Sequence, residues 1–323
     1  MKLVRWGMIG CGAVTEKKSA PAYSRVAGSK LVAVASRRQS SAREYASRRG
    51  IDHVFGETAD LINSDLVDAV YIATPPSSHV SLAMQAAAAN KPCCVEKPLS
   101  TSHATSLQLV NAFEAAGLPL FVAYYRRSLP RFLQVKRWID DGEIGEIRHI
   151  HWGLAREPTV ADLAGDLGWR TNSKDAPGGY FDDLACHGLD LFDFLAEPIE
   201  RASGFSRNLL GLYDAPDAVS ASWTHQGGVT GSGFWNFAAA QRSDKVQIMG
   251  SLGRISFSVF DDNPLALETK GRRIEAAIAN PDPIQLHHVE NMILHLCGER
   301  VHPSLGASAA RTDWVMDRIL GAR

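Results

Sequence analysis

The side chains best suited to chemistry in this sequence follow two adjacent glycines, in the stretch 178–190. Apolar residues recur at helical spacing from Leu184 onwards, which predicts a helix that begins just after the glycine pair. On that helix Asp183 and His187 stand four residues apart and share one face. A carboxylate and an imidazole that project together can bind a hydroxyl group and move its proton near neutral pH. An N-capping aspartate beside a core histidine would give the same pattern, so the stretch alone leaves both interpretations open.

A glycine-rich turn lies upstream, where a buried strand over residues 3–9 ends. The first glycine is expected to make the tight turn, and the second to let a pyrophosphate approach the N-terminus of a helix. Thr15 occupies the third position of this dinucleotide-binding pattern, where Gly or Ala is usual, so the match is incomplete. A second strand over 30–35 completes a βαβ unit. The turn residues predicted to contact the cofactor are Gly10, Gly12, Ala13 and Val14.

The residues after the second strand indicate which dinucleotide is bound. A free ribose 2′-hydroxyl is normally met by an acidic residue about 20 positions after the glycines. Ser36, Arg37 and Arg38 stand there instead, and arginine forks suit a phosphate dianion. The sequence therefore predicts NADP(H) in preference to NAD(H), and a solvated basic turn is the alternative.

Two further strands, 68–73 and 92–95, continue the alternation with helices. Ligands of open parallel sheets bind beyond the carboxyl ends of the strands. Lys97 would lie there beside a nicotinamide and could polarise a substrate oxygen, although a surface Lys–Glu pair is also open. The residues predicted to border the cofactor at these strand ends are Thr74, Pro75, His79, Glu96 and Lys97.

Three motifs in order make the sequence resemble a known family. The strand with its Gly-Cys-Gly turn, the segment 74–79 (Thr-Pro-Pro-Ser-Ser-His) and Glu-Lys-Pro at 96–98 are similar to those of the Gfo/Idh/MocA oxidoreductases, the glucose–fructose oxidoreductase and inositol dehydrogenase group. The family motif Gly-Gly-x-Leu-x-Asp-x-Gly-x-His-x-x-Asp matches the stretch that ends at Asp190, with Phe181 in place of Leu and Ala185 in place of Gly. The resemblance implies catalytic roles for Lys97, Asp183 and His187.

The resemblance also implies an α/β fold with two domains. Residues 1–123 would form a Rossmann domain with a doubly wound parallel sheet. Residues 124–323 would form an α+β domain with a large, open, mainly antiparallel sheet, which often serves as a dimer interface in the family. Period-two patterns and glycine turns support such a sheet, and a homodimer or homotetramer is expected. The predicted strands of this domain are 147–153, 218–225, 234–239, 245–249 and 254–259, and helices are predicted over 130–140, 284–297 and 306–320.

Two pairs of residues are candidates for substrate contact. Tyr125 and Arg126 follow the predicted strand 121–124, and in the family this segment contributes side chains to the pocket. Trp169 and Arg170 lie in a long loop over 155–177, and long ordered loops often cover a site. A charged surface for the first pair and a loop anchor for the tryptophan remain alternatives.

Composition narrows the class of protein. The chain has 323 residues, enough for two domains, and a net charge of −1, which gives no sign of a nucleic-acid partner. No apolar run approaches the roughly 18 residues of a membrane span, and no leader-like segment precedes the first strand. Its five cysteines lack metal-site spacing, and His149 and His151, which share a strand face, are interpreted as sheet surface. A cytoplasmic, soluble protein without a metal is expected.

These features together predict a reaction. A hydride would pass reversibly between a nicotinamide and a carbinol or carbonyl carbon of a sugar, polyol or related cyclic substrate. His187 would be the general acid/base, Lys97 would stabilise oxygen charge, and Asp183 would bind a neighbouring hydroxyl. Two alternatives remain open: a glycosidase of the same family that uses NAD(P) without net redox change, and a non-catalytic protein that senses the dinucleotide.

Overall fold

A computed structural model describes residues 3–321, which form two compact units. The first unit contains the described residues up to Ser100, then Ala104–Leu129 and Pro281–Ala310. The second contains Thr101–His103, Pro130–Asn280 and the described residues from Arg311 onwards. This division differs from the predicted boundary at 123/124, because a late segment of the chain packs into the first unit. No helix among residues 3–321 is long and apolar enough to cross a bilayer.

The first unit is built on six strands in the order β3-β2-β1-β4-β5-β6. All adjacent strands pair in parallel. This order is that of a Rossmann sheet and confirms the predicted fold. The strands are β1 (Val4–Ile9), β2 (Ser29–Ala35), β3 (His53–Phe55), β4 (Ala69–Ile72), β5 (Cys93–Val95) and β6 (Leu120–Val122).

Helices cover both faces of this sheet, as a parallel sheet requires. On one face, Trp6 of β1 shares a core with Tyr23 of α1 and Val289 of α9. On the other, Gly7 lies so close to α3 that a Cβ atom would be 2.6 Å from Leu61. The packing of α9 explains why the segment from Pro281 belongs to this unit. The helices that contribute here are α1 (Ala20–Arg25), α2 (Gln39–Arg49), α3 (Thr58–Asn63), α4 (His79–Ala88), α5 (His103–Ala115) and α9 (Leu286–Leu296).

The second unit is built on eight strands in the order β14-β13-β12-β11-β7-β10-β9-β8. Adjacent strands are antiparallel except for β7 and β10, so the sheet is mixed and mainly antiparallel, as predicted. The predicted strand 234–239 is shifted, since β10 begins at Thr230. Strands β8, β13 and β14 were not predicted. The strands are β7 (Ile147–Ala155), β8 (Ile199–Arg207), β9 (Ala218–His225), β10 (Thr230–Asn236), β11 (Ser243–Gly250), β12 (Gly253–Phe257), β13 (Leu265–Thr269) and β14 (Arg272–Ala276).

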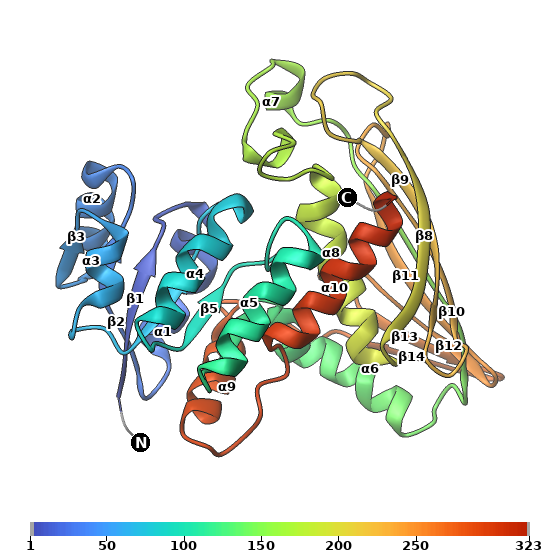
Figure 1. Cartoon of the computed structure of the whole chain (residues 1–323). Helices are drawn as coiled ribbons and strands as arrows, with labels where there is room; N and C mark the ends of the chain where they lie inside the picture. The colour runs from blue at the N-terminus through green and yellow to red at the C-terminus, as the bar shows by residue number, and fades with distance from the viewer. Residues whose placement is uncertain (1–2, 322–323) are drawn as a thin grey trace. The chain divides into compact units, whose positions relative to one another are not determined.

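One face of this sheet is covered by helices. Figure 1 shows α6 (Pro130–Asp140) and α8 (Tyr180–Leu195) along that face, which is the inner face, and none of the described helices of this unit against the opposite, open face. The inner face buries Trp152, Trp235 and Phe192 fully. On the open face His149 lies within hydrogen-bond distance of Thr230 (2.8 Å) and Ser232 (2.9 Å). The remaining helices are α7 (Val160–Leu163), inside the loop after β7, and α10 (Gly306–Leu320).

The contact between α8 and the sheet leaves no room for a side chain at Gly188. A Cβ atom there would lie 2.3, 2.6 and 2.7 Å from three ring carbons of Trp152. Trp152 also meets Phe192 and Trp235 edge-on, with centroids 5.8 and 5.5 Å apart. Gly188 therefore sets how closely α8 approaches β7.

We predict that Gly188→Ala destabilises the protein by about 1–3 kcal/mol because the new methyl group overpacks the indole. The sign of the change in stability is informative, since Gly→Ala inside a helix otherwise stabilises the protein by up to about 1 kcal/mol. Gly168→Ala is the matched control, because its φ is −95° and no atom lies within 4 Å of the new Cβ. Free energies of unfolding from denaturant titration test the prediction, and a stabilised Gly188→Ala variant would contradict it.

Candidate active site

The residues of the first unit that were predicted to contact cofactor or substrate all follow the carboxyl end of a strand. Gly10 follows β1, Ser36 follows β2, Thr74 lies just beyond β4, Glu96 follows β5 and Tyr125 lies just beyond β6. Because these strands are parallel, their carboxyl ends lie at one edge of the sheet. The fold thus brings residues from five loops to the edge at which open α/β sheets bind ligands.

The glycine turn has the shape that a dinucleotide pyrophosphate needs. Gly10 has φ +103°, its N–H donates to the Ala35 carbonyl (2.9 Å), and a Cβ atom there would lie 2.5 Å from the Ala73 carbonyl oxygen. At Gly12, by contrast, no atom lies within 4 Å of a Cβ position. Helical backbone begins at Ala13, and Thr15 donates its hydroxyl to the Gly12 carbonyl (2.8 Å). The N–H groups of such a first turn have no intrahelical acceptor and favour a phosphate, so the turn fits the cofactor.

The basic turn after β2 offers two guanidinium groups to an anion. Arg37 and Arg38 are both exposed, and neither forms an ion pair with a carboxylate of the described chain. Gly10, as described above, is hydrogen-bonded to the last residue of β2, so this turn is a direct neighbour of the glycine turn. Arginines without acidic partners at this place fit a 2′-phosphate.

His79 joins two of the strand-end loops. Its Nε2 lies 2.8 Å from the Thr74 carbonyl and its Nδ1 lies 3.0 Å from the Pro98 carbonyl, and the ring is buried. Burial lowers its pKa below the ordinary value. Both ring nitrogens therefore face backbone carbonyls, and His79 joins the loops after β4 and β5. Its contact with the cofactor stays a prediction.

Glu96 is held inside the first unit by neutral donors. Its side chain is only 7% exposed. Oε1 accepts from the Tyr71 hydroxyl (2.7 Å) and from the Gln285 amide (3.1 Å), while Oε2 accepts from the Lys97 backbone N–H (3.3 Å). Burial and then the Glu96 charge raise the pKa of Tyr71 well above its ordinary value, so the phenol remains a donor. Gln285 precedes α9 and carries no local motif, so the sequence did not identify it.

The residues next to Glu96 and β6 complete this edge. Lys97 is half-buried, and its peptide bond to Pro98 is cis. Tyr125 and Arg126 lie in a short 3-10 helix, Tyr125–Ser128, and both are buried. The Arg126 guanidinium lies 5.0 Å from the centre of the Tyr125 ring, within the range of a cation–π contact.

The second unit places the predicted acid and imidazole at the start of α8. Gly179 before the helix has φ +65°, and a Cβ atom there would lie 2.9 Å from the Ala215 Cβ. Asp182 accepts from the Gly178 N–H (2.6 Å) and so ties the first turn to the preceding loop. Asp183 and His187 follow one turn apart, and both are buried.

Arg170 reaches Asp183 from the loop after β7. Its Nε donates to Asp183 Oδ2 at 2.7 Å, and its guanidinium lies 4.5 Å from the centre of the Trp169 ring. Trp169 and Arg170 lie in a short 3-10 helix, so the predicted loop contains helical turns. The structure therefore brings three of the predicted residues together, with Trp169 stacked on the partner of Asp183.

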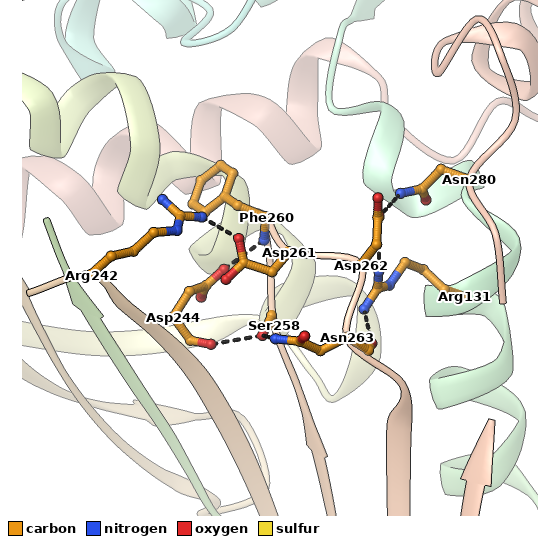
Figure 2. A network of polar contacts seen from close by, with 9 residues as sticks. All are labelled: Arg131, Arg242, Asp244, Ser258, Phe260, Asp261, Asp262, Asn263 and Asn280. Atoms are coloured by element: carbon orange, nitrogen blue, oxygen red, sulfur yellow. Dashed lines mark hydrogen bonds and ion pairs between the residues drawn. The ribbon is translucent and has the colours of Figure 1, made fainter. Parts of the chain in front are cut away.

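His187, which is 5% exposed, borders a residue that the sequence did not identify. The ring centres of His187 and Phe260 are 5.8 Å apart, with the planes at 81°. Phe260 follows β12, and its N–H donates to Asp244 Oδ2 (2.6 Å), as Figure 2 shows. The one signal in the sequence was an acid at position 244, at a buried register position of β11. His149 and His151 lie apart from this site, on the open face of the sheet.

Lys97 belongs to the first unit, whereas Asp183 and His187 belong to the second. Their convergence on one substrate oxygen stays a prediction.

Comparisons with known proteins agree with both units. Residues 4–124 match the GFO/IDH/MocA oxidoreductase family with its NAD-binding Rossmann fold, and residues 132–256 match the GFO/IDH/MocA C-terminal domain. Oxidoreductase P35 of Formosa agariphila is 32% identical over 98% of both chains. The NADP(+)-dependent D-xylose 1-dehydrogenase of Haloarcula marismortui is 26% identical over 87% of this chain and 81% of its own.

A solved levoglucosan dehydrogenase, in complex with NADH and levoglucosan, superposes with a TM-score of 0.86 at 21% identity, over 98% of this chain and 96% of that one. It shows the same fold. Because the sequence matches extend along nearly the whole length, the chain belongs to the GFO/IDH/MocA family of NAD(P)-dependent oxidoreductases.

Proposed function

We propose that this protein is an NADP(H)-dependent dehydrogenase or reductase that acts on a CH–OH carbon of a sugar, polyol or related cyclic substrate. The observation that carries the proposal is the pairing of Asp183 and His187 one turn apart on α8, with Arg170 bound to the acid, in a chain whose other unit is a dinucleotide fold. A sugar presents neighbouring hydroxyl groups, which match a carboxylate beside a proton carrier.

The nicotinamide, when bound, accepts or supplies the hydride that leaves or reaches the substrate carbon. In oxidation the His187 imidazole takes the hydroxyl proton as the carbon–oxygen double bond forms, and in reduction it returns that proton. Lys97 stabilises the charge that develops on the oxygen. Asp183, whose Oδ2 accepts from Arg170, binds a neighbouring hydroxyl, and Arg170 fixes the direction of the carboxylate.

We predict that His187→Ala and Lys97→Met each lower kcat by at least about 10²-fold, since loss of an acid/base group costs roughly 10²–10⁴ in rate. Cofactor affinity should stay within a few fold. His53→Ala and Lys30→Met are matched controls, because both residues are exposed and lie elsewhere on the first unit. Steady-state kinetics and calorimetric cofactor titration give the result. Near-normal turnover in either site variant would contradict the assigned roles.

The cofactor preference rests on the turn after β2. We predict that Arg38→Ala weakens the binding of NADPH by about 10- to 100-fold and leaves the binding of NADH unchanged. The reason is that a charge-assisted hydrogen bond to phosphate contributes about 1.5–3 kcal/mol. Arg43→Ala, an exposed arginine farther along α2, serves as the control. Equal losses with the two cofactors would show that Arg38 does not read the 2′-phosphate.

Substitutions at the two glycines of the turn should have different effects, one on the stability of the fold and the other on cofactor binding. Gly10→Ala is predicted to lower stability, because its Cβ overlaps the Ala73 carbonyl at a positive φ. Gly12→Ala should leave the melting temperature of the cofactor-free protein unchanged, because no atom lies within 4 Å of the new methyl group. It should nevertheless weaken the binding of NADPH at least about tenfold, since the methyl group enters the space assigned to the pyrophosphate. Unchanged NADPH affinity in Gly12→Ala would show that the pyrophosphate does not bind at this turn.

The substrate class is tested with D-xylose, myo-inositol and levoglucosan, each with NADP+ and NAD+, at the nicotinamide absorbance. Stoichiometric reduction of the cofactor is the expected result. Release of an alcohol from a glycoside without net change in cofactor would favour the glycosidase alternative.

The open face of the eight-stranded sheet supports a homo-oligomer. Phe205 of β8 is 79% exposed, and Phe234 and Met249 on the same face are also exposed. Apolar side chains on an uncovered sheet favour a partner surface. We predict that sedimentation at micromolar concentration gives a dimer or tetramer, and that Phe205→Lys with Phe234→Lys shifts it to monomer. Leu209→Lys is the control, because Leu209 is also exposed but lies outside the strands. A monomeric wild-type protein would contradict the proposal.

A further inference from the structure

Asp244 is a buried acid at a position where the strand pattern calls for an apolar residue. In β11 the inward positions are Asp244, Val246 and Ile248. Asp244 is 8% exposed, and the other two are fully buried. A carboxylate at such a position costs free energy unless hydrogen bonds replace its hydration. Residues that break a local pattern in this way are often retained for a role in a site.

The Asp244 carboxylate is satisfied by neutral donors alone. Oδ1 accepts from the indole N–H of Trp152 (2.9 Å), and Oδ2 accepts from the backbone N–H of Phe260 (2.6 Å). Within the described chain no lysine, arginine or histidine forms an ion pair with it; the nearby Arg242 pairs with Asp261 instead. Figure 2 shows the contact with Phe260 and the Arg242–Asp261 pair, and it also shows the Asp244 carbonyl, which accepts from the Ser258 hydroxyl (2.7 Å).

One donor belongs to a residue whose ring faces His187, and the other belongs to a residue that packs on the helix beside it. Trp152 packs against the α8 backbone at Gly188, the next residue. The Phe260 ring lies 5.8 Å from the His187 ring, nearly perpendicular to it. The Trp152 and Phe260 rings are themselves 6.3 Å apart. One carboxylate therefore holds both the indole that packs on α8 at Gly188 and the phenyl ring that faces the imidazole.

The far end of the same loop is also fixed. Arg131, which is 2% exposed, donates to the Asn263 carbonyl (2.9 Å) and to Asp262 Oδ1 (3.3 Å). Asn280 donates to the same Asp262 oxygen (2.6 Å), and Figure 2 shows both contacts beside each other. Residues 258–263 are thus anchored at both ends, and Phe260 lies between the two anchors.

We propose that Asp244 is a positioning residue for His187: its carboxylate fixes Trp152, which packs on the backbone of α8, and Phe260, whose ring faces the imidazole, and so keeps His187 in the orientation that proton transfer requires. The inference rests on the proposed function, in which His187 moves the proton. Supporting groups that lock the rotamer of an acid/base residue act through geometry, and a small misplacement costs rate rather than substrate affinity.

The first test observes the imidazole itself. The cofactor-free protein is labelled with 15N-histidine, and long-range 1H–15N spectra are recorded, with the His187 signals assigned by their loss in His187→Gln. Asp244→Asn keeps the volume but has a single acceptor oxygen for two donors. We expect it to shift or broaden the His187 signals. Asp261→Asn, in the same loop, should leave them unchanged. His187 signals identical to wild type in folded Asp244→Asn would overturn the inference.

The second test is kinetic, with the most active of D-xylose, myo-inositol and levoglucosan. Asp244→Asn and Phe260→Leu should each lower kcat about tenfold with KM within about twofold, whereas Phe260→Tyr, which keeps the ring, should restore the rate. In the His187→Gln background neither change should lower kcat further, because the group they position is gone. Undiminished kcat in Asp244→Asn, or losses that multiply in that background, would overturn the inference and leave Asp244 with a merely structural role.

The outcomes distinguish the two proposals. A fully active His187→Gln variant contradicts the proposed function by itself. A slow His187→Gln variant together with a normal Asp244→Asn variant contradicts only the inference. Should Asp244→Asn not fold, Phe260→Leu carries both tests, since a leucine fills the space without the ring.

Discussion

The second unit depends on the packing of one indole ring against one helix. Trp152 lies so close to α8 that a side chain at position 188 would overlap its ring. His187 is the residue before that glycine. The same indole also donates its N–H to Asp244. One fully buried tryptophan of the unit thus contacts both the helix that carries His187 and the buried acid Asp244.

The first unit solves a different problem, which is to hold several loops at one edge. Parallel strands bring the loops together but do not join them. Hydrogen bonds do so here: His79 links the loops after β4 and β5, and Glu96 links β4 to Gln285. The buried polar atoms of His79 and Glu96 have hydrogen-bond partners on neighbouring segments, so these contacts fix the loops at this edge. Rigid loops with open glycine backbone suit a ligand that is recognised mainly by its phosphates.

The sequence predicted those parts of the fold whose signals are local. Strands β4 and β5 are continuous apolar runs, which is how strands buried on both faces appear. Strand β1 is apolar except for Arg5, and the glycine turn follows it directly. Strand β14, with the sequence RRIEA, carries mostly polar side chains at the sheet edge and was missed. The start of β10 was set too late because Gly231 and Gly233 lower strand propensity. In the structure Trp223 occupies the space beside Gly231, where a Cβ atom would lie 2.0 Å from its ring.

The residues of the candidate site also divide into those that a local sequence signal identified and those that it did not. Asp183, His187 and the turn after β2 were identified because each belongs to a short motif with fixed spacing. Gln285 and Phe260 have no such motif, since their partners lie 189 and 16 residues away in the sequence. Tertiary pairing alone gives them a role. The strand pattern does show that Asp244 is an acid at an inward position. Its role cannot be inferred, however, until its hydrogen-bond donors are known.

The return of Pro281–Ala310 to the first unit limits how this protein can be divided. Val289, Met292 and Ile293 of α9 fill the core beside Trp6 and Tyr23, so a fragment that ends before them would expose an aromatic surface to water. The coenzyme-carrying half is therefore not a detachable module at the amino terminus. Recombination that exchanged the second unit between such enzymes would have to insert the new unit within the chain and could not join two pieces end to end.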